Sequence, residues 1–128
     1  MKLLLDTCTL LWATLAPQSL SPTAAGLIAD DANAILVSAA SAWEIATKVR
    51  LGRFPGAEPL ERDFLEILDA AGYIQFPIDA ASALRAGRLT AFHRDPFDRM
   101  IAAQALGLDI PVISPDIQLD HFAVRRIW

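Results

Sequence analysis

The chain has 128 residues, of which 54% are hydrophobic and 20% are charged, and this composition excludes a disordered protein. The net charge of −4 argues against tight, non-specific nucleic-acid binding, because proteins that coat nucleic acid are usually basic. The lone Cys8 excludes an intramolecular disulfide, and no apolar run approaches the roughly 20 residues that span a bilayer. We therefore expect one soluble, cytoplasmic domain over residues 1–128.

The first part of the chain shows two apolar segments of strand length, each followed by a helical pattern. Ser21 and Pro22 fit the N-cap and the first position of a helix. Ser41 is predicted to start another helix, which Gly52 follows just past its end. The elements expected here are, in chain order, a strand over 2–5, a helix over 9–15, a helix over 22–30, a strand over 34–38 and a helix over 41–50.

The second part of the chain continues the alternation of helices and strands. An amphipathic pattern over 60–71 places Leu60, Phe64 and Leu68 on one helix face. Asp79 can cap the next helix, Asp95 the one after it, and Gly107 is predicted to end the latter. The elements expected here are a helix over 60–71, a strand over 73–78, helices over 80–89 and 96–106, and strands over 111–114 and 123–128.

Strands that alternate with helices are typical of an α/β domain with a mostly parallel central sheet. In such sheets, sites form beyond the carboxyl ends of the strands. Asp6 directly follows the first strand, and Asp116 follows the strand over 111–114, after Pro115. These two carboxylates are therefore expected to converge.

Two of the candidate acids also have local structural explanations. Asp6 can cap the helix that begins near Thr9. Glu44 completes a Ser-x-x-Glu capping box with Ser41, and it can form an ion pair with Lys48 four residues further on. Each explanation competes with a functional role.

Asp95 and Asp98 lie at the start of one predicted helix. We assign capping to Asp95 and chemistry to Asp98, because Asp98 shares an inward-looking face with Ile101 and Ala102. Asp116 can be a turn residue or a cap, and the nearby Asp120 can take its place as the fourth acid.

Taken as a set, the acids predict a metal site. Carboxylate oxygens are hard ligands that suit Mg²⁺ or Mn²⁺, and a cation offsets the repulsion between crowded carboxylates. Such a metal can activate water and stabilise charge on a scissile phosphate. The two histidines and one cysteine show no zinc spacing, and there is no Gly-rich phosphate loop. The predicted ligands and catalytic residues are Asp6, Glu44, Asp98 and Asp116.

Several other side chains are candidates near these acids. Lys48 and Arg99 can meet RNA phosphates. Lys48 can equally belong to a solvated face, whereas Arg99 is the better candidate because it adjoins Asp98. Arg94 adjoins the same helix start as Arg99. His93 can touch substrate or act as a general base, with a structural or surface role as the alternative.

Four segments, in order along nearly the whole chain, match the pattern of a known family. The sequence resembles the PIN-domain ribonucleases, and among them the VapC-type toxins of bacterial toxin–antitoxin pairs. The segments that carry the resemblance are LLDT at 4–7, SAASAWEI at 38–45, HRDPFDRMIAAQA at 93–105 and VISPD at 112–116.

The resemblance implies a three-layer α/β/α fold with a short parallel sheet, Mg²⁺ or Mn²⁺ as cofactor, and endonucleolytic cleavage of RNA. By motif, Asp6, Glu44, Asp98 and Asp116 match the family's four acids in order, and Thr7 matches a position that supports the site. Pro115 departs from the pattern, in which a small residue usually follows the serine. The resemblance also implies a homodimer and a VapB-like antitoxin that covers the acidic pocket, often with an arginine.

Two other functions compete with the nuclease. A catalytically silent PIN-like module would bind RNA or protein without metal-dependent cleavage. A receiver-type phosphotransfer domain would need paired acids near the start and a phosphoacceptor aspartate after a central strand. In this chain Asp6 stands alone, and the corresponding central strand runs into serines and alanines.

Overall fold

The computed structural model describes residues 1–128 and contains one five-stranded sheet in which all neighbouring strands are parallel. The central strand β1 (Lys2–Leu5) pairs with β2 (Ala34–Ser38) on one side and with β4 (Val112–Ile113) on the other. The edge strands are β3 (Ile74–Phe76) and β5 (Arg126–Ile127), which gives the order β3-β2-β1-β4-β5. The predicted α/β class with a short parallel sheet is therefore confirmed.

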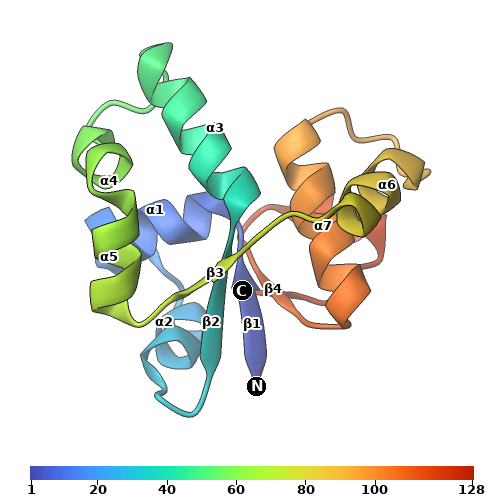
Figure 1. Cartoon of the computed structure of the whole chain (residues 1–128). Coiled ribbons are helices and arrows are strands. Elements are labelled where there is room, and N and C mark those ends of the chain that lie inside the picture. The colour runs from blue at the N-terminus through green and yellow to red at the C-terminus, as the bar shows by residue number, and fades with distance from the viewer.

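Helices cover both faces of the sheet, so β1 is buried on both sides. Leu3 and Leu5 belong to one core cluster and Leu4 to the other, because alternate side chains of a strand point to opposite faces. Figure 1 shows the three layers, with the sheet seen nearly edge-on between two groups of helices. One group contains α1 (Thr7–Leu15), α2 (Pro22–Ala29), α4 (Glu58–Arg62) and α5 (Phe64–Ala71), and the other contains α6 (Ala80–Arg88) and α7 (Pro96–Leu108).

Helix α3 (Ala39–Arg50) continues directly from the carboxyl end of β2. Its N-cap is Ser38, whose hydroxyl accepts a hydrogen bond from the backbone N–H of Ala40. The capping box predicted for Ser41 is therefore wrong: Ser41 lies inside the helix and is fully buried. The strand ends on a serine that itself caps the helix, so no loop separates the two elements.

Two other helix boundaries differ from the predictions. The helix expected over 60–71 is divided at Asp63, and this bend leaves both Leu60 and Leu68 buried in one core cluster. Helix α7 runs past Gly107 to Leu108, and its C-cap Asp109 adopts a left-handed conformation. A Cβ at Gly107 would meet the guanidinium end of Arg85 of α6, a flexible side chain that can shift.

Two short 3₁₀ helices complete the chain, Pro17–Ser19 and Ile117–Phe122. The second one follows β4, and the last strand, expected over 123–128, is limited to Arg126–Ile127. None of the helices has the length and apolar character required to cross a membrane.

Candidate functional site

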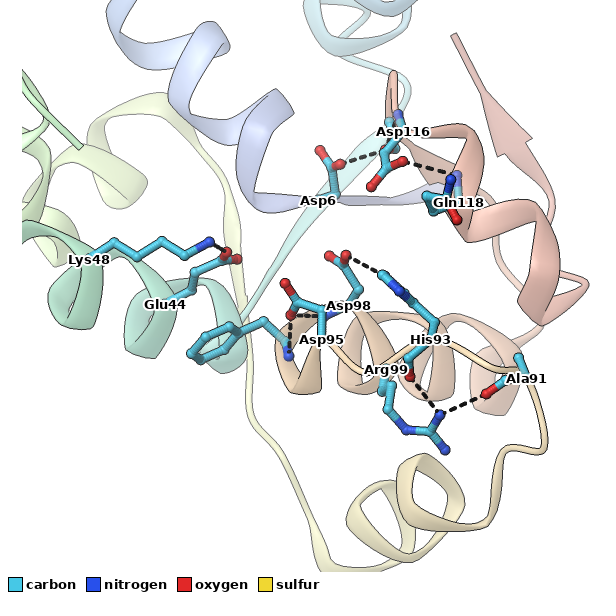
Figure 2. A network of polar contacts seen from close by, with 12 residues as sticks. Asp6, Glu44, Lys48, Ala91, His93, Asp95, Asp98, Arg99, Asp116 and Gln118 are labelled. Carbon is cyan, nitrogen blue, oxygen red and sulfur yellow. Dashed lines mark hydrogen bonds and ion pairs between the residues drawn. The ribbon is translucent and has the colours of Figure 1, made fainter. Parts of the chain in front are cut away.

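A pocket of about 340 Å³ lies at the carboxyl ends of β1 and β4, where α1, α3 and α7 meet. All four predicted acids line it, and Figure 2 shows them on separate elements around a common space. This is the position at which parallel α/β sheets form sites, beside the point where the strand order reverses. The lining residues are Asp6, Thr7, Cys8, Leu11, Glu44, Lys48, Phe54, Asp95, Asp98, Pro115 and Asp116.

Asp6 is buried, with only 4% of its surface exposed. Its Oδ1 accepts a hydrogen bond of 2.8 Å from the backbone N–H of Thr9, so it caps α1 as the local pattern predicted. Its Oδ2 accepts a hydrogen bond of 2.5 Å from the hydroxyl of Ser114. Burial raises the pKa of Asp6 despite these donors, and the nearby charge of Asp116 raises it further.

Asp116 is connected to Asp6 through the same serine. The backbone N–H of Asp116 donates to Oγ of Ser114 over 2.9 Å, and its carboxylate accepts from the backbone N–H of Gln118 over 2.9 Å. Asp116 therefore caps the short helix that follows β4, and it still lines the pocket. The predicted convergence of Asp6 and Asp116 is confirmed.

Glu44 is 5% exposed and reaches the pocket from the second turn of α3. One carboxylate oxygen forms the predicted ion pair with Lys48, as Figure 2 shows. The other, Oε1, is buried and has no hydrogen-bond partner. An unpaired carboxylate oxygen is costly to bury, so this atom is suited to binding a cation.

Thr7 supports this arrangement from α1. Its hydroxyl lies 2.9 Å from the hydroxyl of Ser41, and both side chains are buried. This contact joins the start of α1 to α3 one turn before Glu44. Sequence reasoning missed Ser41 as a site-supporting residue, because its local pattern also fitted a helix cap.

The start of α7 behaves as predicted. The carboxylate of Asp95 accepts from the backbone N–H groups of Phe97 and Asp98, at 2.9 and 3.2 Å, and so caps the helix. Asp98 shares its face with fully buried Ile101 and Ala102. This leaves the side chain of Asp98 turned inward, toward the pocket.

His93 lies beside Asp98, with 2.9 Å between Nε2 of the histidine and Oδ2 of the aspartate. Burial raises the pKa of Asp98 to about 6, although the hydrogen bond from His93 acts in the opposite direction. The ring of His93 also contacts Phe122, with 5.5 Å between centroids. His93 therefore holds an acid of the pocket in place.

Two sequence candidates lie outside the pocket. Arg99, expected to meet RNA, instead points away from the acids and binds backbone carbonyl oxygens of the last turn of α6 and of the segment between α6 and α7. The sequence placed it beside Asp98, but neighbours along a helix point in directions about 100° apart. Asp120 pairs with Arg126 over 2.8 Å and is no substitute for Asp116.

Cys8 reflects the negative charge of the pocket. Its side chain is half-buried on the pocket wall. Burial raises the pKa of its thiol to about 11, and the charges of Asp6, Asp116 and Glu44 contribute to this shift. The pocket therefore favours a cation.

The donor set fits a hard divalent cation. The carboxylates of Asp6, Glu44, Asp98 and Asp116 surround one acidic pocket, and Oε1 of Glu44 is free. No three acidic, histidine or cysteine side chains stand close enough to hold an ion as they are. Each carboxylate also accepts at least one hydrogen bond from a protein donor.

Known proteins share both the sequence pattern and the fold. The chain is 51% identical over 45 residues to Ribonuclease VapC16 of Mycobacterium tuberculosis, a match that covers 35% of this chain and 31% of that protein. The matched part is thus under a third of the relative's length. The fold resembles that of VapBC2 from Rickettsia felis, whose structure was solved bound to promoter DNA, with a TM-score of 0.72 and 16% identity over 100% of this chain and 99% of the other.

A second solved structure, FitAcB from Neisseria gonorrhoeae, has a TM-score of 0.65 and 21% identity over 98% of this chain and 96% of the other. At these identities the likeness is one of fold. The sequence model of the PIN domain matches residues 3–125, which is nearly the whole chain. The chain therefore belongs to the PIN-domain family.

Proposed function

We propose that this protein is a Mg²⁺-dependent endoribonuclease, able to use Mn²⁺, that acts as the toxin of a toxin–antitoxin pair. The observation that carries the proposal is the single pocket in which four carboxylates from distant parts of the chain meet. Membership of the PIN family and the similarity to a protein named as a ribonuclease support it.

Asp6, Glu44, Asp98 and Asp116 would hold the metal, which supplies Lewis-acid stabilisation of the charge that develops on the scissile phosphate. The protein's own contribution is to fix these ligands. Ser114 and the backbone of Thr9 hold Asp6, and His93 holds Asp98. Lys48 keeps one oxygen of Glu44 directed at the ammonium group and leaves the other without a partner.

The direct test is Asp6→Asn assayed with RNA and Mg²⁺. The asparagine oxygen can still accept from Thr9, so the cap is retained while the charge is lost. We expect cleavage to fall by about 100-fold or more, because a metal ligand contributes several kcal/mol to charge stabilisation. Exposed Asp31→Asn is the matched control. A folded Asp6→Asn protein that cleaves at the wild-type rate would refute the metal-site assignment, and RNA binding without cleavage by the wild type would favour a silent module.

The antitoxin is proposed on the chemistry of the pocket and on the fold. Structures of VapBC and FitAB assemblies have the same fold as this chain. A guanidinium from a VapB-like partner suits an acidic pocket and would compete with the metal. Induced expression in a bacterial host should arrest growth, and the Asp6→Asn variant should not. A neighbouring short reading frame whose product prevents the arrest would identify the partner.

A homodimer is also part of the proposal. Trp43 is 61% exposed near the start of α3, although it contacts Phe97 edge-on with 4.8 Å between ring centroids. A large exposed aromatic side chain of this kind is typical of an interface. Sedimentation velocity of the wild type and of Trp43→Ala tests this, and a monomeric wild type at all concentrations would exclude the dimer.

A further inference from the structure

Phe92 is the most exposed large hydrophobic side chain of the protein, at 93% of its surface. It lies in the segment between α6 and α7, at residues 89–95. Nη1 of Arg99 donates to the carbonyl oxygens of Ala91 and His93, at 3.1 and 3.0 Å. The backbone on both sides of Phe92 is thus attached to α7, and the exposed ring is presented from an anchored position, as Figure 2 shows for the flanking residues.

The segment that carries this exposed ring leads into the acidic pocket. The next residue along the chain, His93, directs its side chain to Asp98, one of the four pocket acids. Consecutive Cα atoms are about 3.8 Å apart, so the backbone of Phe92 lies one residue from His93 and three from Asp95, which lines the pocket. Its polar neighbours Thr90, His93 and Arg94 leave it outside any continuous apolar stretch of sequence.

Arg94 supplies a positive charge beside the Phe92 ring. Its guanidinium lies 5.7 Å from the centroid of the Phe92 ring, and its side chain is exposed. The other cations close to the acids are already engaged: Lys48 pairs with Glu44, and Arg99 binds backbone carbonyl oxygens. Arg94 forms no ion pair or hydrogen bond through its side chain, so it is available to a phosphate.

We propose that Phe92 and Arg94 bind one nucleotide of single-stranded RNA beside the acidic pocket. The base stacks on the Phe92 ring, and Arg94 pairs with a phosphate of the same strand. This inference rests on the proposed nuclease function and adds a contact to the substrate outside the metal ligands. An aromatic ring with an adjacent guanidinium matches a base and its phosphate, whereas a protein partner would require a wider apolar patch.

The test is equilibrium binding of a short, fluorescein-labelled, single-stranded RNA of mixed sequence, followed by anisotropy in EDTA to prevent cleavage. Phe92→Ala should weaken binding by about 5- to 100-fold, the usual effect of losing one base–aromatic stack. Phe92→Trp should bind like the wild type, and Phe92→Leu should resemble the alanine variant. Leu65→Ala, which removes a 59% exposed side chain from α5, is the matched control.

Arg94→Ala should weaken binding to all sequences and reduce the slope of log affinity against log salt by about 0.7, the value for one contact to single-stranded phosphate. Exposed Arg50→Ala is its control. The same RNA annealed to its complement should lose the effect of Phe92→Ala, because paired bases cannot stack on the ring.

Several outcomes would overturn the proposal. These are a Phe92→Ala protein with wild-type affinity, a Phe92→Leu protein that binds as tightly as Phe92→Trp, or a Phe92→Ala protein that changes only the oligomeric state. Circular dichroism checks that the variants are folded. If the wild type cleaves RNA and Phe92→Ala changes neither binding nor cleavage, the Phe92 contact alone is refuted. A wild type that neither binds nor cleaves RNA refutes the proposed function itself.

Discussion

The hydroxyl of Ser114 donates a hydrogen bond of 2.5 Å to Oδ2 of Asp6, although the two residues are 108 positions apart in the chain. Both side chains are buried. Parallel pairing of β1 with β4 places Leu5 opposite Ile113, so the residues that follow each strand are also neighbours. The bond therefore joins an acid near the start of the chain to a serine near its end.

Ser114→Ala should destabilise the metal-free protein by about 1–3 kcal/mol at pH 7, because it deprives a buried carboxylate of a donor. The hydrogen bond from Ser114 lowers the pKa of Asp6, so its loss raises this pKa further above the ordinary value. Urea unfolding in EDTA measures the effect. In an Asp6→Asn background the cost of Ser114→Ala should shrink, and an equal cost in both backgrounds would show that the hydroxyl acts elsewhere.

The raised pKa of Asp98, about 6, predicts a pH-dependent stability. An acid with a raised pKa in the folded state stabilises the fold fully below its unfolded value of 3.8, and this contribution is lost as the pH rises through about 6. The free energy of unfolding of Asp98→Asn should therefore exceed that of the metal-free wild type by on the order of 2 kcal/mol at pH 7. The two proteins should be equally stable at pH 4. Thermal unfolding in EDTA at several pH values measures this, and parallel curves for the two proteins would contradict it.

Lys48→Met should strengthen the binding of Mg²⁺. The ammonium group of Lys48 pairs with Glu44 and competes with the metal for that carboxylate. Removing an interaction of about 1 kcal/mol lowers Kd by about fivefold. Isothermal titration with MgCl₂ measures the affinity, and Lys2→Met, an exposed change near the opposite end of β1, is the control. Weaker binding in Lys48→Met would mean that the lysine assembles the site.

Arg99→Met should destabilise the protein by about 2–4 kcal/mol, since it leaves several backbone carbonyl oxygens without their charged donor. These belong to residues 86, 89, 91 and 93. Arg99→Lys should recover only part of the loss, because an ammonium cannot copy the planar guanidinium fork. Hydrogen exchange should rise first in the segment between α6 and α7, and unchanged exchange there would refute this role.

Elements whose signals are local were predicted well from the sequence. Asp79 and Asp95 cap their helices as expected, since a cap depends on residues within a few positions. The helix start predicted at Ser41 was wrong, because Ser38 caps the helix and Ser41 lies inside it. The strand over 34–38 was predicted with the observed bounds, and the error was to leave two residues between it and the helix. The helix end predicted at Gly107 was wrong because α7 continues to Leu108 and Asp109 adopts the left-handed conformation that ends it.

Within the site, the convergence of Asp6 and Asp116 followed from one general rule about parallel sheets. The orientation of Arg99 did not, because proximity along a helix says little about where a long side chain ends. The partners of Ser41 and Ser114 were also out of reach, since both contacts join segments far apart in sequence. The positions of the acids could be predicted from motifs, whereas the residues that hold them require the fold.

The strand order has a consequence for synthesis of the protein. The central strand β1 leaves the ribosome first, but its neighbour β4 is made near the end of translation. A growing chain therefore carries Asp6 and Glu44 long before Asp98 and Asp116 exist. In a product truncated before β4, the central strand β1 has lost one of its two neighbouring strands. Such a product also lacks Asp116, and it leaves Asp6 without the hydroxyl of Ser114.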